Sequence, residues 1–214
     1  MTSTTAPLRI GFVPGVTLTK WRRVWDERFP TPLDIVELAD AEQRRALVVG
    51  DIDMCFVRRP IDTDGLHLIP LYDEVVVAWA AKEHPVAAFE EVTLADLADE
   101  NVLDDYGQIS IDAAVAEAAV LRVPMSIARM HNRRDLVYRP ITDAAPSPVG
   151  LAWRQDNEHP SIEEFIGVVR GRTANSSRTA QERNATPPPA QKPAQRGQKG
   201  QRPAHPRQQR RGRR

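Results

Sequence analysis

Short apolar segments alternate with amphipathic stretches over the first sixty residues of the chain. LRIGFVP at 8–14, LDIVEL at 33–38 and MCFVR at 54–58 read as strands, and each gap between them can hold one helix. Strand–helix–strand order at intervals of about twenty residues predicts right-handed crossovers, a parallel sheet and helices packed on it. The sequence therefore predicts an α/β fold.

Two helices are expected between these strands. Leu18, Trp21 and Trp25 lie three and four residues apart, which places them on one face of a helix that ends near Arg28. We expect Thr17 to cap this helix. The second helix is expected over 41–49, with Asp40 as its N-terminal cap and Gly50 as a left-handed residue after its last turn.

The rest of the body continues with mixed signals. Extended segments are expected between 66 and 82, Thr93 is expected to cap a short helical turn, and a last helix is expected from Ser161 to near Gly171. Between them lie a brief strand at NVL, a helical segment near 112–119, a strand at LRVP, a helix from Ser126, and strands at DLVYRP and PVGLAW.

The net charge of zero hides two oppositely charged regions. From Gly171 to Arg214 there are twelve Lys or Arg and a single acid, Glu182, whereas residues 1–170 hold 17 basic and 28 acidic residues. An acidic body thus carries a basic tail. This asymmetry indicates a charged partner for the tail, or a tail that folds back onto its own body.

The tail, 173–214, has no aromatic residue and is rich in Pro, Gln and Arg, so we expect it, like residues 1–7, to be disordered. Its arginines can neutralise phosphates, but without aromatic side chains they read no bases. Weakly specific DNA or RNA binding and a merely solubilising tail both stay open. The nucleic-acid candidates are Arg202, Arg207, Arg210, Arg211, Arg213 and Arg214.

Several motifs in a fixed order resemble the effector-binding domain of LysR-type transcriptional regulators. LRIGFVPG, a helix ending in RFP, PLDIVEL and a helix ending in GDIDMCFVR come first. GLHLIPLYDEVVVAWAAKEHPVA, VTLADLADENVL, VPMSIARMHNRRDLVYRPITD and PVGLAWR follow. The resemblance covers residues 8–172, and its most specific elements are GDID and the HP after the VVVAWAAK strand.

This resemblance implies a two-lobed fold of the type-2 periplasmic-binding-protein class, with a small-molecule cleft between the lobes. The first lobe would use about 8–72 and 135–172, and the second about 73–134. A small organic, often anionic, effector is the implied ligand, and a homodimer or a mixed dimer with a full-length regulator is the implied assembly. The positions that match the family's cleft are Val16, Thr17, Val57, Arg58, Val123 and Pro124.

The chain departs from the family pattern in two ways. The family places a winged helix-turn-helix ahead of this domain, and no such reader precedes residue 8 here, although a misplaced start codon would also explain that. The segment 102–123 is short and lacks a glycine-rich loop before LRVP. We therefore expect an abbreviated second lobe, and whether it still completes a working cleft stays open.

Arg58 and Arg59 at the exit of the third strand are either an anion clamp or a solvated loop. No Gly-rich phosphate loop, nucleophile elbow or paired metal ligands occur, so we expect no catalysis, no metal and no cofactor. The only cysteine, Cys55, is expected to be buried, and the lack of a membrane span or signal fits a cytoplasmic protein.

Two functions are consistent with these features. The first is a ligand-sensing regulatory protein of the LysR effector-domain type without its own helix-turn-helix. The alternative is a nucleic-acid-associated scaffold that acts through its basic tail and has a vestigial cleft. An enzyme on the same scaffold is disfavoured because no catalytic constellation is present.

Overall fold

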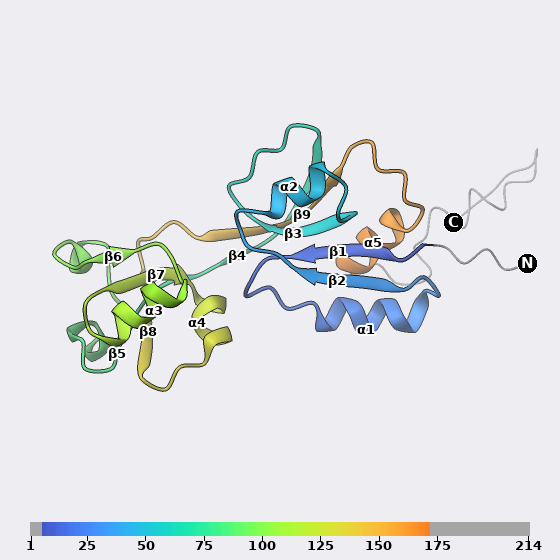
Figure 1. Ribbon diagram of the computed structural model, residues 1–214. Helices are drawn as coiled ribbons and strands as arrows, with labels where there is room; N and C mark the ends of the chain where they lie inside the picture. Colours follow the sequence, from blue (N-terminus) through green and yellow to red (C-terminus); the bar gives the residue numbers. More distant parts are fainter. Residues whose placement is uncertain (1–5, 172–214) are drawn as a thin grey trace, which may run out of the picture. The chain divides into compact units, whose positions relative to one another are not determined.

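The computed structural model describes residues 6–171, which contain two separate β-sheets. We call the parts built on them the first and second lobes. The chain passes between the lobes twice, from β4 into β5 and from β8 into β9 (Figure 1). The nucleic-acid candidates of the tail, Arg202 to Arg214, lie outside the described residues.

The first sheet has five strands in the order β2-β1-β3-β9-β4. β1 pairs in parallel with β2 and β3, as the strand–helix spacing predicted, but β9 runs antiparallel to both β3 and β4. The sheet is therefore mixed, not purely parallel, because β9 returns from the second lobe. The strands are β1 Leu8–Phe12, β2 Leu33–Glu37, β3 Met54–Arg58, β4 Leu66–Glu74 and β9 Ser147–Arg154.

Helices cover both faces of this sheet. α1 (Thr19–Arg28) and α5 (Ile162–Val169) pack on one face, and α2 (Gln43–Val48) packs on the other (Figure 1). The centre of the larger core is Trp25, which stacks on Phe29 at 4.3 Å between ring centroids and meets Phe165 edge-on at 5.6 Å. Burial of these large rings stabilises the lobe through apolar area removed from water.

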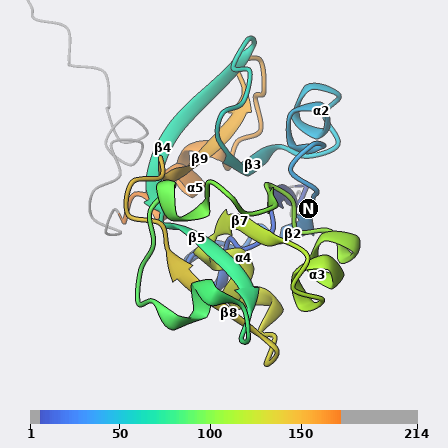
Figure 2. The same cartoon turned by 90° about the vertical axis from the view of Figure 1, so that its left-hand side faces the viewer.

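The second sheet has four strands in the order β6-β7-β5-β8. α3 (Gln108–Val115) and α4 (Met125–His131) pack on one face, and the 3-10 turns η1 (Pro85–Ala88) and η2 (Ala95–Leu97) pack on the other. The strands are β5 Val76–Ala81, β6 Val102–Leu103, β7 Val120–Pro124 and β8 Leu136–Pro140. Figure 2 shows β5, β7 and β8 of this sheet with α3 and α4.

The expected return to the first lobe at residue 135 is wrong by several residues. β8 pairs antiparallel with β5, from Val77 opposite Pro140 to Ala81 opposite Leu136, so it belongs to the second sheet. The chain returns after Pro140. The local pattern of DLVYRP shows that it is a strand, but which sheet it joins depends on pairing with a strand about sixty residues earlier in the chain.

Both expected helix caps at the first lobe are also wrong. α1 begins at Thr19 with Leu18 at the N-cap, and α2 begins at Gln43 with Glu42 at the N-cap; neither cap side chain accepts a hydrogen bond. Thr17 and Asp40 therefore stand outside the helices. By contrast, Gly50 has φ +77° after α2, which confirms its expected left-handed conformation.

The GDID segment, Gly50 to Asp53, connects α2 to β3 and is bound to β1 through Arg9. The Asp53 carboxylate accepts hydrogen bonds from Arg9 Nε at 3.1 Å and Arg9 Nη2 at 2.7 Å, and from the Arg9 backbone N–H at 2.9 Å. Arg9 Nη1 donates to the carbonyls of Gly50 at 2.7 Å and Asp51 at 2.9 Å. The Arg9 side chain thus binds three of the four residues of the motif.

Candidate functional site: the inter-lobe cleft

A cleft of about 550 Å³ lies between the two lobes. The end of β1 and the loop after it, the crossing from β4 to β5, and α4 contribute its walls. Apolar side chains dominate it, and the polar groups are few, as is usual for small-molecule sites. Its lining residues are Phe12, Gly15, Val16, Thr17, Glu74, Val75, Met125, Ser126, Arg129 and Met130.

Glu74, the last residue of β4, connects both lobes. Its Oε2 atom accepts a hydrogen bond from Arg58 Nη1 of the first lobe at 2.6 Å and one from Ser126 Oγ of the second lobe at 2.9 Å. The side chain of Arg58 is 10% exposed and that of Glu74 is 11% exposed. A charge-assisted pair this well buried is strong, because little water competes for it.

Arg58 is held from several sides. Its Nη1 also donates to Ser147 Oγ at 3.0 Å, at the beginning of the return strand β9, and its Nη2 donates to the Pro14 carbonyl at 2.9 Å. Gln43 exchanges two 2.9 Å hydrogen bonds with the backbone of Arg58. The guanidinium is therefore fixed where both crossings and the β1–α1 loop meet.

Asp40 and Tyr106 form a second polar contact between the lobes. The Tyr106 hydroxyl donates to Asp40 Oδ2 at 3.1 Å, and the same oxygen lies 3.8 Å from Arg58 Nε. Burial, with Asp40 as the next cause, raises the pKa of Tyr106 to about 12, so the phenol stays a donor. Asp40 Oδ1 and Arg58 Nε are both buried and have no hydrogen-bond partner.

Gly15 brings the first lobe close to α4. It has φ +86°, and a Cβ built on it would lie within 3.0 Å of Ser126 Cβ and still closer to Ser126 Oγ. Only a residue without a side chain lets the β1–α1 loop approach Ser126 this closely. The cleft floor is thus a tight contact between Gly15, Ser126 and Glu74.

The expected ligand residues occupy three kinds of place. Val16, which is buried, and Thr17, which is exposed, line the cleft, while Arg58 is not among the lining residues but donates to Glu74, which is. Pro124 pairs with Val76 at the crossing and precedes α4. Val57 and Val123 are buried in the cores of their own lobes and are not among the cleft-lining residues.

Sequence reasoning did not find Glu74, Ser126 or Arg129 as site residues. Ser126 carried a usable signal, since it opens a helix next to the expected ligand position Pro124. Glu74 carried none, because a charged residue at the end of an extended segment is ordinary. The Arg129 guanidinium lies 5.9 Å from the Tyr138 ring centroid, and its Nε donates to the Tyr138 hydroxyl at 3.2 Å.

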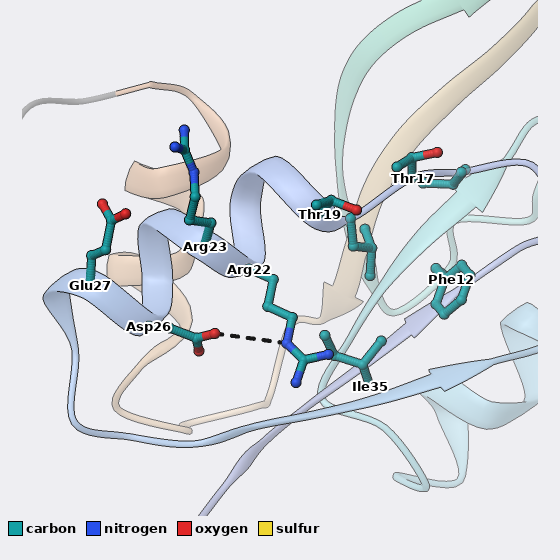
Figure 3. A pocket seen from close by; sticks show the side chains of 10 residues that line it. Phe12, Thr17, Thr19, Arg22, Arg23, Asp26, Glu27 and Ile35 are labelled. Atoms are coloured by element: carbon teal, nitrogen blue, oxygen red, sulfur yellow. Dashed lines mark ion pairs between the residues drawn. The ribbon is translucent and has the colours of Figure 1, made fainter.

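A second hollow of about 700 Å³ runs along α1 and shares Phe12, Val16 and Thr17 with the cleft. Figure 3 shows Arg22 reaching over Ile35 of β2. The Arg22 Nε atom lies 3.8 Å from the Asp26 carboxylate, and both side chains are more than half exposed. Solvent screens a pair of this kind, so this hollow offers an open surface and no fixed charged group.

Within residues 6–171 no three His, Cys, Asp or Glu side chains are placed to hold a metal ion. In the same part of the chain, no helix has the length and apolar character needed to cross a membrane.

The two sheets, the double crossing and the cleft between the lobes define a two-lobed α/β ligand-binding domain. The model of the LysR substrate binding domain family matches residues 3–110, half of the chain. The chain therefore belongs to the LysR substrate-binding domain family, as the motif order indicated, and its predicted α/β fold class is confirmed.

Curated relatives are transcriptional regulators. The chain is 26% identical over 202 residues to the Hca operon transcriptional activator HcaR of Escherichia coli (strain K12), covering 78% of this chain and 68% of the relative. It is also 26% identical over 196 residues to the HTH-type transcriptional regulator AlsR of Bacillus subtilis (strain 168), covering 75% and 65%. The chain thus spans about two thirds of the length of these relatives, which are regulators and not enzymes.

Solved structures show the same fold. The BenM effector binding domain with its effector benzoate superposes with a TM-score of 0.65 at 22% identity, covering 87% of this chain and 97% of that chain. Full-length BenM gives a TM-score of 0.67 at 21% identity, covering 88% and 72%.

Proposed function

We propose that this chain senses a small organic effector in the inter-lobe cleft and thereby regulates transcription. The observation that supports this function most is the cleft itself, whose walls come from both lobes and from the crossing between them. A ligand held by both lobes binds one lobe arrangement better than another, and this difference in affinity is what shifts a conformational equilibrium.

We propose further that the effector is anionic and approaches Arg58 through the cleft. The Nε atom of the guanidinium makes no hydrogen bond, and Ser126 and Thr17 place hydroxyl groups along the cleft. The apolar walls, which include Phe12, Met125 and Met130, suit an aromatic or branched carbon skeleton. Because the structurally similar BenM domain binds benzoate, benzoate is the first ligand to test.

Thermal unfolding of the full chain with benzoate, other carboxylates and amino acids tests this function. A ligand at 100 times its Kd stabilises a protein by about 2.7 kcal/mol, or roughly 5–11 °C for a chain of this size. Thr17→Trp should abolish the shift by filling the cleft. Thr19→Trp is the matched control, since Thr19 is equally exposed but lines only the hollow along α1. An equal shift in both variants would place the ligand elsewhere.

Charge asymmetry favours a second role for the basic tail. We propose that the arginines between 202 and 214 give weakly specific affinity for DNA or RNA, so that affinity falls steeply with salt. Comparing the salt dependence of DNA binding for the full chain and for one ending at residue 171 tests this role. Equal affinities for both chains would assign the tail no part in it.

We also propose that the chain acts as a dimer in the cytoplasm, either with itself or with a full-length regulator. Membership of a family of transcription regulators supports this assembly. Sedimentation of the full chain, alone and mixed with such a regulator, measures it. A monomer at all concentrations and in every mixture would exclude it.

A further inference from the structure

We infer that Glu74 is an internal stand-in for the carboxylate of the effector: it occupies the donor groups of Arg58 and Ser126, and an anionic effector displaces it. This inference rests on the proposed function, because it concerns the same cleft. Glu74 then determines which ligands bind in the cleft, and its displacement couples ligand binding to the contact between the two lobes.

The donor geometry supports this role. Arg58 Nη1 and Ser126 Oγ converge on a single oxygen, Glu74 Oε2, from opposite lobes, at 2.6 Å and 2.9 Å. Two donors from different elements that meet on one carboxylate oxygen form the arrangement that a carboxylate ligand requires. Glu74 itself lines the cleft, so a ligand in the cleft lies next to these donors.

Arg58 can hold an anion without moving. Both of its terminal nitrogens donate hydrogen bonds and its backbone is held by Gln43, while its Nε is buried and makes no hydrogen bond. A buried guanidinium stripped of its carboxylate is strongly disfavoured, so an incoming carboxylate that replaces Glu74 restores the lost pairing. The displacement is therefore an exchange of one carboxylate for another.

The position of Glu74 links this exchange of carboxylates to the contact between the lobes. Glu74 ends β4, and a single residue, Val75, separates it from Val76, the first residue of β5, so it lies at the outgoing crossing between the lobes. Its bond to Ser126 ties that crossing to α4, beside the 2.9 Å hydrogen bond from the Met125 N–H to the Val75 carbonyl. When Glu74 leaves Ser126, the crossing loses this side-chain bond to the second lobe and keeps only the backbone bond between Met125 and Val75 at this point.

This arrangement also predicts selectivity. Glu74 competes with every anionic ligand, so the observed affinity is reduced by the small fraction of molecules in which Glu74 has left its donors. A neutral ligand gains nothing from replacing it. The cleft therefore admits those carboxylates whose carbon skeleton also gains contacts with the apolar walls.

Chemical rescue in the full chain tests the inference. Glu74→Ala removes the internal carboxylate and leaves room for a small one. We expect the melting temperature of Glu74→Ala to be lower than that of the wild type, and to be restored by acetate or propionate but not by acetamide or propionamide. Propionate should bind Glu74→Ala at least about tenfold more tightly than wild type, a difference of 1.4 kcal/mol. Glu83→Ala, at an exposed acid of the second lobe, is the matched control.

A second variant distinguishes the loss of the Glu74 carboxylate from a loss of folding. Glu74→Gln keeps the shape of the side chain but replaces the charge-assisted bonds by weaker neutral ones. It should also bind propionate more tightly than wild type does. In the wild-type chain, propionate should speed hydrogen exchange at the Met125 amide, which a purely structural role of Glu74 would not produce.

The outcomes separate this inference from the proposed function. Equal or weaker propionate binding by both Glu74 variants overturns the inference. A neutral compound that binds in the cleft, with no carboxylate binding to any variant, overturns the inference and leaves effector sensing in place. Failure of every compound to bind the wild type and both variants overturns both.

Discussion

Replacing Asp53 with Asn is expected to lower the free energy of unfolding by about 2 kcal/mol. Asp53 is buried and accepts three hydrogen bonds from Arg9, at 2.9, 3.1 and 2.7 Å. Hydrogen bonds to charged groups contribute about 1.5–3 kcal/mol each, and the amide keeps only part of this set. We use the low end because the side chain of Arg9 is 39% exposed and solvent screens it.

The effect should depend on pH in a defined direction. Burial alone would raise the pKa of Asp53, but the hydrogen bonds from Arg9 outweigh it and hold that pKa below its ordinary value. An acid with a lowered folded-state pKa contributes stability above its unfolded pKa, about 3.9, and loses that contribution as the pH falls through the folded value. The difference between wild type and variant should therefore be full at pH 7 and shrink below about pH 5.

Thermal unfolding followed by circular dichroism between pH 7 and pH 2.5 measures this prediction. About 2 kcal/mol corresponds to a fall in melting temperature of roughly 4–8 °C at pH 7. Asp51→Asn is the control, because the neighbouring Asp51 carboxylate is 62% exposed and lies 3.9 Å from Arg45. If Asp53→Asn matches Asp51→Asn at pH 7, or if its deficit stays constant down to pH 2.5, the assigned role of the Arg9 pair is refuted.

Three further changes test other parts of the fold. Gly15→Ala should lower the melting temperature more than Gly65→Ala does. Both glycines have a positive φ, but only Gly15 is packed against Ser126. Equal losses of melting temperature would contradict the tight contact between the lobes. Trp25→Ala should cost about 3–5 kcal/mol of stability in chemical denaturation, because a fully packed ring is lost; a loss below 1 kcal/mol would show that the core closes around the gap. Burial, with Asp40 as a lesser cause, raises the pKa of Cys55 to about 12. A thiol reagent should therefore label Cys55 only as fast as the chain unfolds. Rapid labelling of the native chain would refute this expectation.

The sequence was sufficient for features that depend on neighbours along the chain. The strand at 54–58, the left-handed Gly50 and the capping of the turn after Thr93 all follow from residues within one helical turn. The helix expected near 112–119 exists but lies earlier, at 108–115. The alanine-rich stretch 112–119 carries no periodicity that would mark the ends of a helix, so only the surrounding packing sets them.

Features that depend on distant partners were beyond the sequence. Thr17 and Asp40 are good capping residues, yet in both helices the first turn begins two or three residues later. For Asp40 the reason is visible: its carboxylate meets Tyr106, sixty-six residues away, and lies near Arg58. A local preference for capping is worth about 1 kcal/mol, which a buried polar contact between lobes can exceed.

The sequence predicts the two arginines at the exit of β3 but not the group that Arg58 binds. An anion clamp and a solvated loop were the two alternatives for Arg58 and Arg59, and the structure shows a third arrangement for Arg58, an internal ion pair with Glu74. A side chain that is 10% exposed at the edge of a buried strand must have an acceptor. The sequence left a solvated loop open, so it is the burial that establishes this need, and either a carboxylate sixteen residues away or an effector carboxylate can satisfy it. That equivalence is the physical basis for exchange between Glu74 and a ligand.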